Sequence, residues 1–175
     1  MTATARDMRV LVSVGTDVHH FDRLVGWADR WAQDHPDDVV MVQHGTSAPP
    51  TAAEGAELFG RAEMLERLEC SDVVILSCGP GAVMDARGRG RFPIVVPRRP
   101  DLGEHVDGHQ LVFARHLEQH GMASVAENES TFRNLLDQAR REPDSFTVAA
   151  DASEPSGVKR LGSLIDDLLG GSATA

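Results

Sequence analysis

The sequence lacks the features of a secreted or membrane-spanning protein. No uninterrupted apolar stretch approaches the roughly 18 residues that suggest a membrane-spanning helix. The opening segment, MTATARDMRVLVSVG, has no apolar signal core followed by a cleavage site. We therefore expect a cytoplasmic protein that does not insert directly into a membrane.

Basic side chains are in the minority. The chain carries 27 acidic and 17 basic residues, a formal net charge of -10. It has no cluster of lysine and arginine of the kind that follows a phosphate backbone. This charge balance argues against nucleic acid and anionic membrane surfaces as partners.

Cysteine is rare as well. The two cysteines, Cys70 and Cys78, bracket the segment SDVVILS, which predicts a strand. A strand of this length would hold the two thiols roughly 20 Å or more apart, well beyond disulfide reach. We expect both to be reduced, and neither lies in a motif that marks a nucleophile.

Several motifs of catalysis and nucleotide binding are missing. The chain has neither a G-x-S-x-G nucleophile elbow nor a P-loop, and the VGT segment after the first predicted strand lacks the full G-x-G-x-x-G fingerprint. These absences give little support to a nucleotide hydrolase or a dinucleotide-binding enzyme.

What the chain does contain is a regular alternation of short apolar segments and helical segments. The expected strands are 8–15, 38–45, 72–79, 92–97 and 122–126, and the expected helices are 21–33, 62–69, 82–90, about 105–120, 129–142 and about 156–169. Because the strands are apolar throughout, the pattern predicts an α/β fold with a Rossmann-like parallel sheet and helices on both faces. The length fits a single domain over 1–175, with its core at about 8–142.

Four loops are expected to meet at one edge of this sheet. In parallel sheets, ligands bind where the carboxyl ends of strands meet the N-termini of helices, because backbone N–H groups and the helix dipole attract anions there. The loops concerned are 14–20, 43–50, 77–85 and 97–110.

The loop SCGPGAVMD is the first candidate for a phosphate site. Gly79 and Gly81 permit close approach to the backbone, and Gly81 and Ala82 should offer N–H groups at the start of a helix. Asp85, expected in the first helical turn, could accept hydrogen bonds from a ribose diol. The alternative is an ordinary capped turn with Asp85 as a partner of the helix dipole, and the local pattern does not decide between the two.

The segment GEHVDGHQ offers a possible metal site. In a helix, His105 and His109 would lie four residues apart on one face, a spacing at which paired histidines can hold zinc. No third ligand follows at motif spacing, because both thiols are isolated and the next histidines lie two or three turns further along. We therefore expect no bound metal.

Other charged residues in the loops have two interpretations. Arg98 and Arg99 leave the fourth strand at its carboxyl end, where a guanidinium could pair with phosphate or could balance nearby acidic residues in solvent. His19 and His20, near a helix start, could act as acid or base near neutral pH, although surface histidines are more common than catalytic ones.

Two blocks of the sequence carry a family resemblance. SVGTDVHHFDRLV and SDVVILSCGPGAVMDARGRGRFPIVVPRRPDLGEHVDGHQLVFARHLEQHGMA, in this order, resemble the C-terminal domain of glycosyltransferase family 28 over roughly residues 8–125. The family includes the transferase that makes the lipid-linked peptidoglycan disaccharide. Closer in length are the stand-alone catalytic subunits of the dolichol-pathway N-acetylglucosaminyltransferase and of bacterial exopolysaccharide transferases.

The resemblance implies one half of a GT-B fold that binds a UDP-sugar. It places Gly79, Gly81 and Ala82 at phosphate and nucleoside, and Asp85 at the uridine ribose. The segment around His105, His109 and Gln110 would contact diphosphate and sugar through hydrogen bonds. The full set of expected substrate-binding residues is Gly15, Thr16, Gly79, Gly81, Ala82, Asp85, Arg98, His105, His109 and Gln110, with His19 as the candidate catalytic base.

The implied activity is an inverting hexosyl transfer without metal or cofactor. The chain has the length of one GT-B half, so the resemblance implies a heteromer with a membrane-anchored subunit that binds a lipid-linked or polysaccharide acceptor, and hence a peripheral position at the inner membrane face. Asp85 stands where glutamate is usual in the family, and Cys78 where histidine or serine is commoner. The alternatives are a non-catalytic nucleotide-sugar binding or regulatory module, and a doubly wound domain for another phosphate ligand.

Overall fold

The computed structural model describes residues 7–149. They form a six-stranded parallel sheet in the order β3-β2-β1-β4-β5-β6. The strands are β1 (Arg9–Ser13), β2 (Val39–Gln43), β3 (Glu54–Ala56), β4 (Val73–Ser77), β5 (Ile94–Val96) and β6 (Ser124–Val125). The helices are α1 (Asp22–Asp34), α2 (Arg61–Cys70), α3 (Pro80–Gly88), α4 (His109–Gln119) and α5 (Glu129–Arg141), with 3-10 turns at Pro100–Leu102 and Pro143–Phe146. The expected helix at about 156–169 falls outside the described residues.

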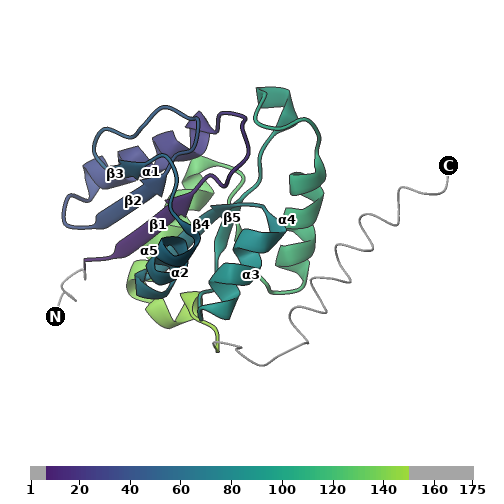
Figure 1. Cartoon of the computed structure of the whole chain (residues 1–175). Helices are drawn as coiled ribbons and strands as arrows, with labels where there is room; N and C mark the ends of the chain where they lie inside the picture. The colour runs from purple at the N-terminus through teal and green to yellow at the C-terminus, as the bar shows by residue number, and fades with distance from the viewer. Residues whose placement is uncertain (1–6, 150–175) are drawn as a thin grey trace.

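Helices cover both faces of this sheet, as Figure 1 shows. Along β1, Val10 and Val12 belong to the cluster that contains α1 and α5. Leu11 points the other way, into the cluster with α2 and α3, and α4 packs on that second face through Phe113 and Leu117. Because the central strands β1, β2, β4 and β5 are largely buried on both sides, their sequences are mostly apolar, and the helices on both faces of the parallel sheet confirm the predicted Rossmann-like α/β fold.

Strand pairing brings the carboxyl ends of the central strands to one level. Ser13 at the end of β1 pairs with Gln43 at the end of β2 and with Leu76 of β4. The strand order reverses direction between β1 and β4, so the loops that follow these two strands diverge and leave a crevice at this edge.

The strand β3 was not predicted. Its sequence, Glu54 to Ala56, has little intrinsic strand preference, and the segment was expected to be part of a loop. It is ordered through parallel pairing with β2, in which Met41 pairs with Glu54. A nearby carboxylate also anchors this connection, because Asp29 of α1 accepts hydrogen bonds from the backbone N–H groups of residues 51–53 at 2.7–3.0 Å.

Two predicted helix starts were wrong. The helix α3 begins at Pro80, two residues earlier than expected, because proline is well suited to the first helical position. The helix α4 begins at His109 instead of His105, after Gly108. The Asp107 carboxylate accepts a hydrogen bond from the His109 N–H at 3.0 Å, a local turn that competes with helix at 105–108.

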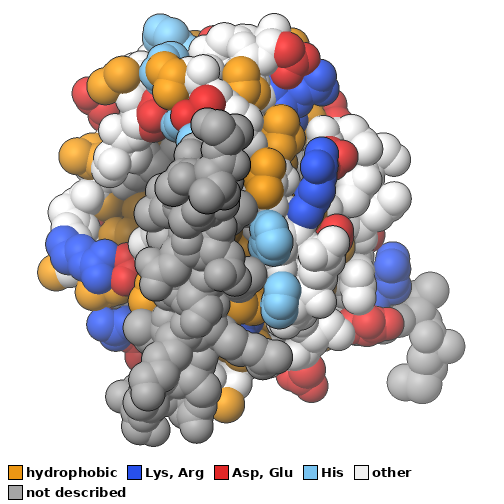
Figure 2. Space-filling model, turned by 90° about the vertical axis from the view of Figure 1, so that its right-hand side faces the viewer, with side chains coloured by type: hydrophobic (Ala, Val, Ile, Leu, Met, Phe, Trp, Pro, Cys, Tyr) orange, Lys and Arg blue, Asp and Glu red, His pale blue; other side chains and the backbone are white. Residues whose placement is uncertain are grey.

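The surface shows no dominant charge in the view of Figure 2, where acidic and basic side chains are interspersed on the part of this face that is coloured by type. Among the described residues, none of the helices combines the length and the apolar character needed to cross a bilayer.

Candidate functional site

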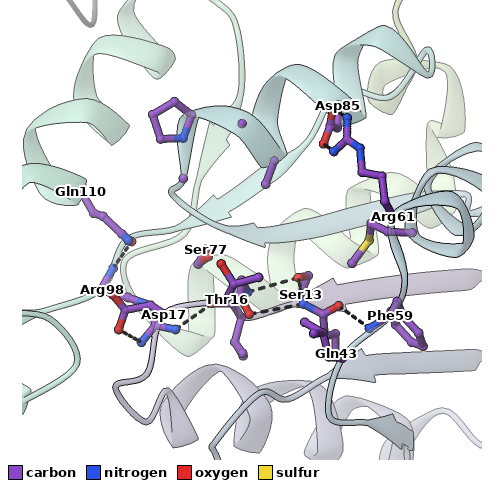
Figure 3. A pocket seen from close by; sticks show the side chains of 18 residues that line it. Ser13, Thr16, Asp17, Gln43, Phe59, Arg61, Ser77, Asp85, Arg98 and Gln110 are labelled. Atoms are coloured by element: carbon purple, nitrogen blue, oxygen red, sulfur yellow. Dashed lines mark hydrogen bonds and ion pairs between the residues drawn. The ribbon is translucent and has the colours of Figure 1, made fainter.

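A pocket of about 550 Å³ opens at the carboxyl ends of β1, β2 and β4 (Figure 3). All four loops that the sequence places at this edge contribute to it. Its lining consists of Ser13, Val14, Gly15, Thr16, Asp17, Gln43, Leu58, Phe59, Arg61, Met64, Ser77, Gly79, Pro80, Gly81, Ala82, Asp85, Arg98 and Gln110. The volume lies within the range of about 300–1,000 Å³ typical of small-molecule sites.

The floor of the pocket consists of polar residues that end apolar strands. Ser13, Gln43 and Ser77 are each at least 95% buried. The Gln43 amide donates to the Ser13 hydroxyl at 3.1 Å and to the Gly15 carbonyl at 3.3 Å, and its oxygen accepts from the Phe59 N–H at 3.0 Å. None of these three residues belongs to a recognised motif, and none was among the expected site residues, although a polar side chain at the end of an otherwise buried strand is a recognisable signal.

Gly15 is required by the geometry of the first loop. Its φ of +80° lies in the left-handed region, and a Cβ added there would meet the Ser77 hydroxyl oxygen at 2.9 Å. The loop after β1 therefore passes so close to the end of β4 that only glycine fits. Thr16 and Asp17 follow it along the pocket wall.

The N-terminus of α3 faces the pocket with unused donors. Gly79 donates its N–H to the Ser77 carbonyl at 2.7 Å, and Pro80 has no N–H. The N–H groups of Gly81 and Ala82 have no acceptor within the helix, as at every helix start. A Cβ added at Gly79 or Gly81 would meet no atom within 4 Å, so there is open space beside both glycines, which line the pocket.

Asp85 lies at the other end of the pocket, paired with Arg61. Because α3 begins at Pro80, Asp85 is in the second helical turn. The expectation that Asp85 lies in the first turn, where it would interact with the helix dipole, was wrong. Arg61 Nη1 donates a hydrogen bond to Asp85 Oδ2, and Arg61 Nη2 donates one to Asp85 Oδ1 at 2.8 Å. Arg61 was not among the residues expected at the site.

Arg98 lines the pocket, but its guanidinium is committed to the protein backbone. The residue is 0% exposed and donates to the carbonyls of Val14, His19 and Glu104 at 2.7–2.9 Å. Burial lowers the pKa of Arg98 although the charges of Asp17 and Glu104 oppose this. Its neighbour Arg99 is half exposed and pairs with Asp101. In this structure Arg98 thus joins the first and fourth loops through its two terminal nitrogens, whereas its buried Nε has no hydrogen-bond partner among the described residues.

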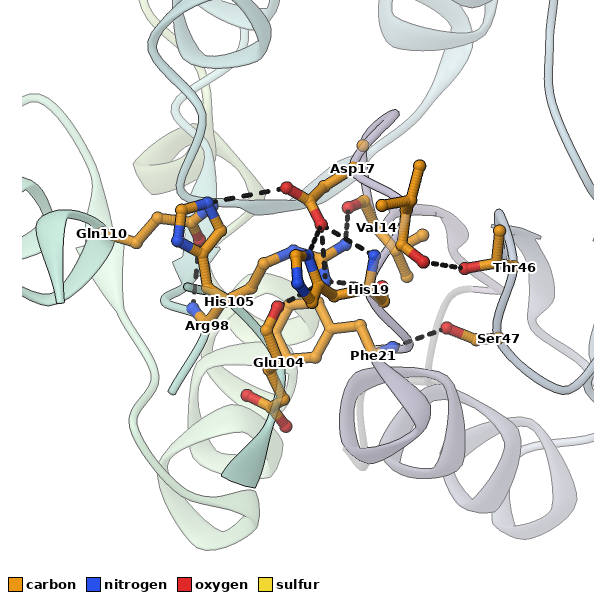
Figure 4. A network of polar contacts seen from close by, with 12 residues as sticks. Val14, Asp17, His19, Phe21, Thr46, Ser47, Arg98, Glu104, His105 and Gln110 are labelled. Carbon is orange, nitrogen blue, oxygen red and sulfur yellow. Dashed lines mark hydrogen bonds and ion pairs between the residues drawn. The ribbon is translucent and has the colours of Figure 1, made fainter. Parts of the chain in front are cut away.

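A network of carboxylates and imidazoles lies beside the pocket (Figure 4). Asp17 accepts hydrogen bonds from the His19 N–H at 2.8 Å and contacts His19 Nδ1 at 2.6 Å, and His105 Nε2 lies 3.5 Å from its other oxygen. Burial acts to raise the pKa of Asp17, but the hydrogen bonds of His19 and the charge of Arg98 outweigh it, so this pKa lies below its usual value. Asp17 is therefore an ionised partner that orients the His19 ring.

The histidines of the fourth loop do not share a helical face. His105 precedes α4, whereas His109 is its first residue, with a side chain that is 68% exposed and paired with Asp107 at 2.7 Å. Neither lines the pocket, but Gln110 does, and its side-chain oxygen accepts from the Arg98 N–H at 3.0 Å. Within residues 7–149, no cluster of three or more histidine, cysteine or acidic side chains is arranged to hold a metal ion.

Cys78 follows β4 directly, yet its thiol is not exposed to the pocket. The residue is 1% exposed, and burial raises the pKa of its thiol to about 12. Cys70 is exposed.

We expect a thiol reagent at about pH 8 to modify Cys70 alone in the native chain, and both thiols after unfolding, because only accessible thiolate reacts. Rapid native-state modification of a Cys70→Ser variant would contradict this assignment.

Comparisons with known proteins bear on the fold. A scan against protein-family models gives no match, and a search of curated protein sequences gives none either. Among solved structures, the glycotransferase of kitacinnamycin matches 97% of this chain with a TM-score of 0.59 and 19% identity. The calicheamicin glycosyltransferase CalG4 matches 94% with a TM-score of 0.57 and 15% identity. MurG of Acinetobacter baumannii matches 94% with a TM-score of 0.56 and 16% identity.

The chain spans only part of these structures, namely 41%, 38% and 51% of their respective lengths. At these identities the likeness concerns the course of the backbone alone. The chain has the Rossmann-like α/β fold of one half of a GT-B glycosyltransferase.

Proposed function

We propose that this chain is the donor-binding subunit of an inverting glycosyltransferase that uses a UDP-sugar. The observation that carries the proposal is the pocket at the β1–β4 crevice, which Gly81 and Ala82 line with N–H groups that have no acceptor within the helix. Two such donors at the positive end of a helix dipole suit a diphosphate. The likeness to sugar transferases supports the same ligand class.

The length of the pocket suggests how a nucleotide sugar would lie. In Figure 3, Asp85 and Arg61 mark one end, and Arg98 and Gln110 mark the other. We place the nucleoside at Asp85, where a carboxylate can accept hydrogen bonds from both ribose hydroxyls, and the diphosphate at the start of α3. The sugar would then lie toward Gln110, whose side-chain oxygen accepts from the Arg98 N–H and whose side-chain nitrogen remains as a donor for the ligand.

The reaction would be a single displacement at the anomeric carbon. The acceptor oxygen forms the new bond as the bond to the diphosphate oxygen breaks, and the acceptor proton passes to a base. The Gly81 and Ala82 N–H groups would stabilise the charge that develops on the departing diphosphate. His19 is the candidate base from this chain, because Asp17 holds its Nδ1 at 2.6 Å and leaves Nε2 to accept a proton.

A second polypeptide is part of this proposal. The described residues supply one half of a GT-B fold and a pocket that is open at its mouth. We propose that a membrane-anchored subunit supplies the acceptor-binding half and brings the chain to the inner face of the membrane. The acceptor would be a lipid-linked or polysaccharide glycan that receives a hexose or N-acetylhexosamine.

Calorimetric titration of the chain with UDP, UDP-N-acetylglucosamine, UDP-glucose, NADH and ATP, with and without EDTA, tests the proposal. We expect selective binding of the uridine ligands that EDTA does not change. Asp85→Ala should weaken binding of UDP and of the UDP-sugars, and Gln110→Ala should weaken binding of the UDP-sugars, each by about 1 to 3 kcal/mol, because each variant removes a hydrogen-bonding partner at the ligand.

Asp101→Ala is the matched control for these variants. It also removes a carboxylate, but Asp101 is exposed, pairs with Arg99 and lies outside the lining of the pocket. Its affinity for UDP and for the UDP-sugars should equal that of the wild type. Equal affinity in the folded Asp85→Ala and Gln110→Ala variants would refute the proposed pocket.

A further inference from the structure

We propose that Arg61 is a positioning residue of the donor site. Its guanidinium holds the Asp85 carboxylate in the orientation that recognises a ribose diol. The inference rests on the proposed function and extends it to a residue of a different helix. Arg61 is the first residue of α2, and Asp85 lies in the second turn of α3. Both line the same pocket.

The geometry of the pair fixes the carboxylate. The two terminal nitrogens of Arg61 bind the two oxygens of Asp85 in a side-by-side arrangement, the form of this pair with the greatest geometric specificity. Each carboxylate oxygen keeps a further acceptor site. Two adjacent hydroxyl donors, as on an unsubstituted ribose, can use both sites at once, whereas a 2′-deoxyribose offers only one donor.

The short side chain of Asp85 makes such support necessary. Aspartate has one methylene between Cα and the carboxyl group, so its oxygens reach little beyond the surface of α3. The Asp85 side chain is 22% exposed, and that of Arg61 is 70% exposed. Arg61 of α2 is the side chain that binds both carboxylate oxygens, and α3 itself supplies no hydrogen bond to them among the described residues.

The positive charge of Arg61 also neutralises the Asp85 carboxylate inside the pocket. The ionic side chains of the pocket lining are Asp17, Asp85, Arg61 and Arg98. Arg98 is fully buried and donates to backbone carbonyls, so it does not neutralise Asp85. Without Arg61, the Asp85 carboxylate would repel a diphosphate bound at the start of the same helix.

The test compares UDP with 2′-deoxy-UDP and with uridine by calorimetry in the wild type and in Arg61→Ala. We expect the wild type to prefer UDP over 2′-deoxy-UDP by about 10-fold, from one hydrogen bond to a charged acceptor. Arg61→Ala should reduce this preference to about 3-fold or less. In an Asp85→Ala background, Arg61→Ala should leave the preference unchanged, because the residue acts through the carboxylate. Arg61→Lys should restore only part of the preference, since an ammonium group cannot bind both oxygens side by side.

The matched control is Arg89→Ala. Arg89 pairs with Glu69 at 3.0 Å and also joins α3 to α2, but at the far ends of these helices and outside the pocket lining. This variant removes the same charge and should keep the full preference for ribose. A purely structural role for Arg61 would affect UDP and 2′-deoxy-UDP equally.

The outcomes separate this inference from the proposed function. If the wild type binds UDP and Arg61→Ala keeps the full ribose preference, the inference is wrong and the donor site stands. If Arg61→Ala loses affinity for UDP but none for uridine, Arg61 acts on the phosphates through its charge and not on the ribose through Asp85, and the positioning role is likewise overturned. Failure of the wild type to bind any of the three ligands would overturn the proposed function together with the inference.

Discussion

Replacing Arg98 by methionine is expected to lower the free energy of unfolding by about 3 to 5 kcal/mol, the cost of removing one partner from a buried ionic network. The Arg98 side chain is 0% exposed, and its donors satisfy three backbone carbonyls from two separate loops. Methionine fills similar volume without a donor, so the carbonyls would stay buried and unpaired. Urea-induced unfolding, followed by circular dichroism, measures the change.

Arg99→Met is the control for this prediction. Arg99 is the next residue, is half exposed and pairs with Asp101 in solvent, so its loss should change the free energy of unfolding by no more than about 0.5 kcal/mol. Arg98→Lys should be nearly as destabilising as Arg98→Met, because an ammonium group cannot reproduce the planar fork that spans Val14, His19 and Glu104. Equal stability of the Arg98 and Arg99 variants would mean that the buried network contributes little.

The arginine pair also illustrates what the sequence could predict. Position at the carboxyl end of a strand correctly placed Arg98 beside the pocket. Its partners could not be predicted, because His19 and Val14 lie 79 and 84 residues away in the chain. A guanidinium at this edge suits a phosphate and a set of carbonyls equally well, and only the course of the first loop distinguishes them.

The fold was predictable for a related reason. Strands buried on both faces leave a continuous apolar signal, and β1, β2, β4 and β5 were all expected from it. The strand β3 has no such signal, because pairing with β2 orders a segment of weak intrinsic preference. The start of α4 was also misjudged, because the contact of Asp107 with the His109 N–H stabilises a turn where periodicity alone favours helix.

The structure brings some of the predicted site residues together and leaves others apart. The four loops meet as expected, and Gly15, Thr16, Gly79, Gly81, Ala82, Asp85, Arg98 and Gln110 line one pocket, whereas His19, His105 and His109 lie outside its lining. Arg61 was missed because it lies 24 residues before Asp85 and opens a helix with no motif of its own. Contacts between separate helices of this kind follow from packing on the sheet, which local pattern does not encode.

Substitution of Gly81 by leucine is expected to lower the affinity for UDP by roughly 100-fold, while the free energy of unfolding stays the same or rises by up to about 1 kcal/mol. A Cβ added at Gly81 meets no atom within 4 Å, so the folded chain accommodates a side chain there. Leucine is also a better helix former than glycine. The added side chain would occupy the space through which a diphosphate reaches the N–H groups of Gly81 and Ala82.

The control variant Gly88→Leu separates the effect on UDP affinity from the effect on the free energy of unfolding. Gly88 is the last residue of α3, is equally free of neighbours within 4 Å of an added Cβ, and lies outside the pocket lining. Both variants should unfold at a urea concentration equal to or above that of the wild type, but only Gly81→Leu should lose UDP in calorimetric titration. Full affinity in Gly81→Leu would place the diphosphate away from the start of α3. Because the glycine is not needed for folding, a loss of binding without a loss of stability would identify its open space as space kept for a ligand.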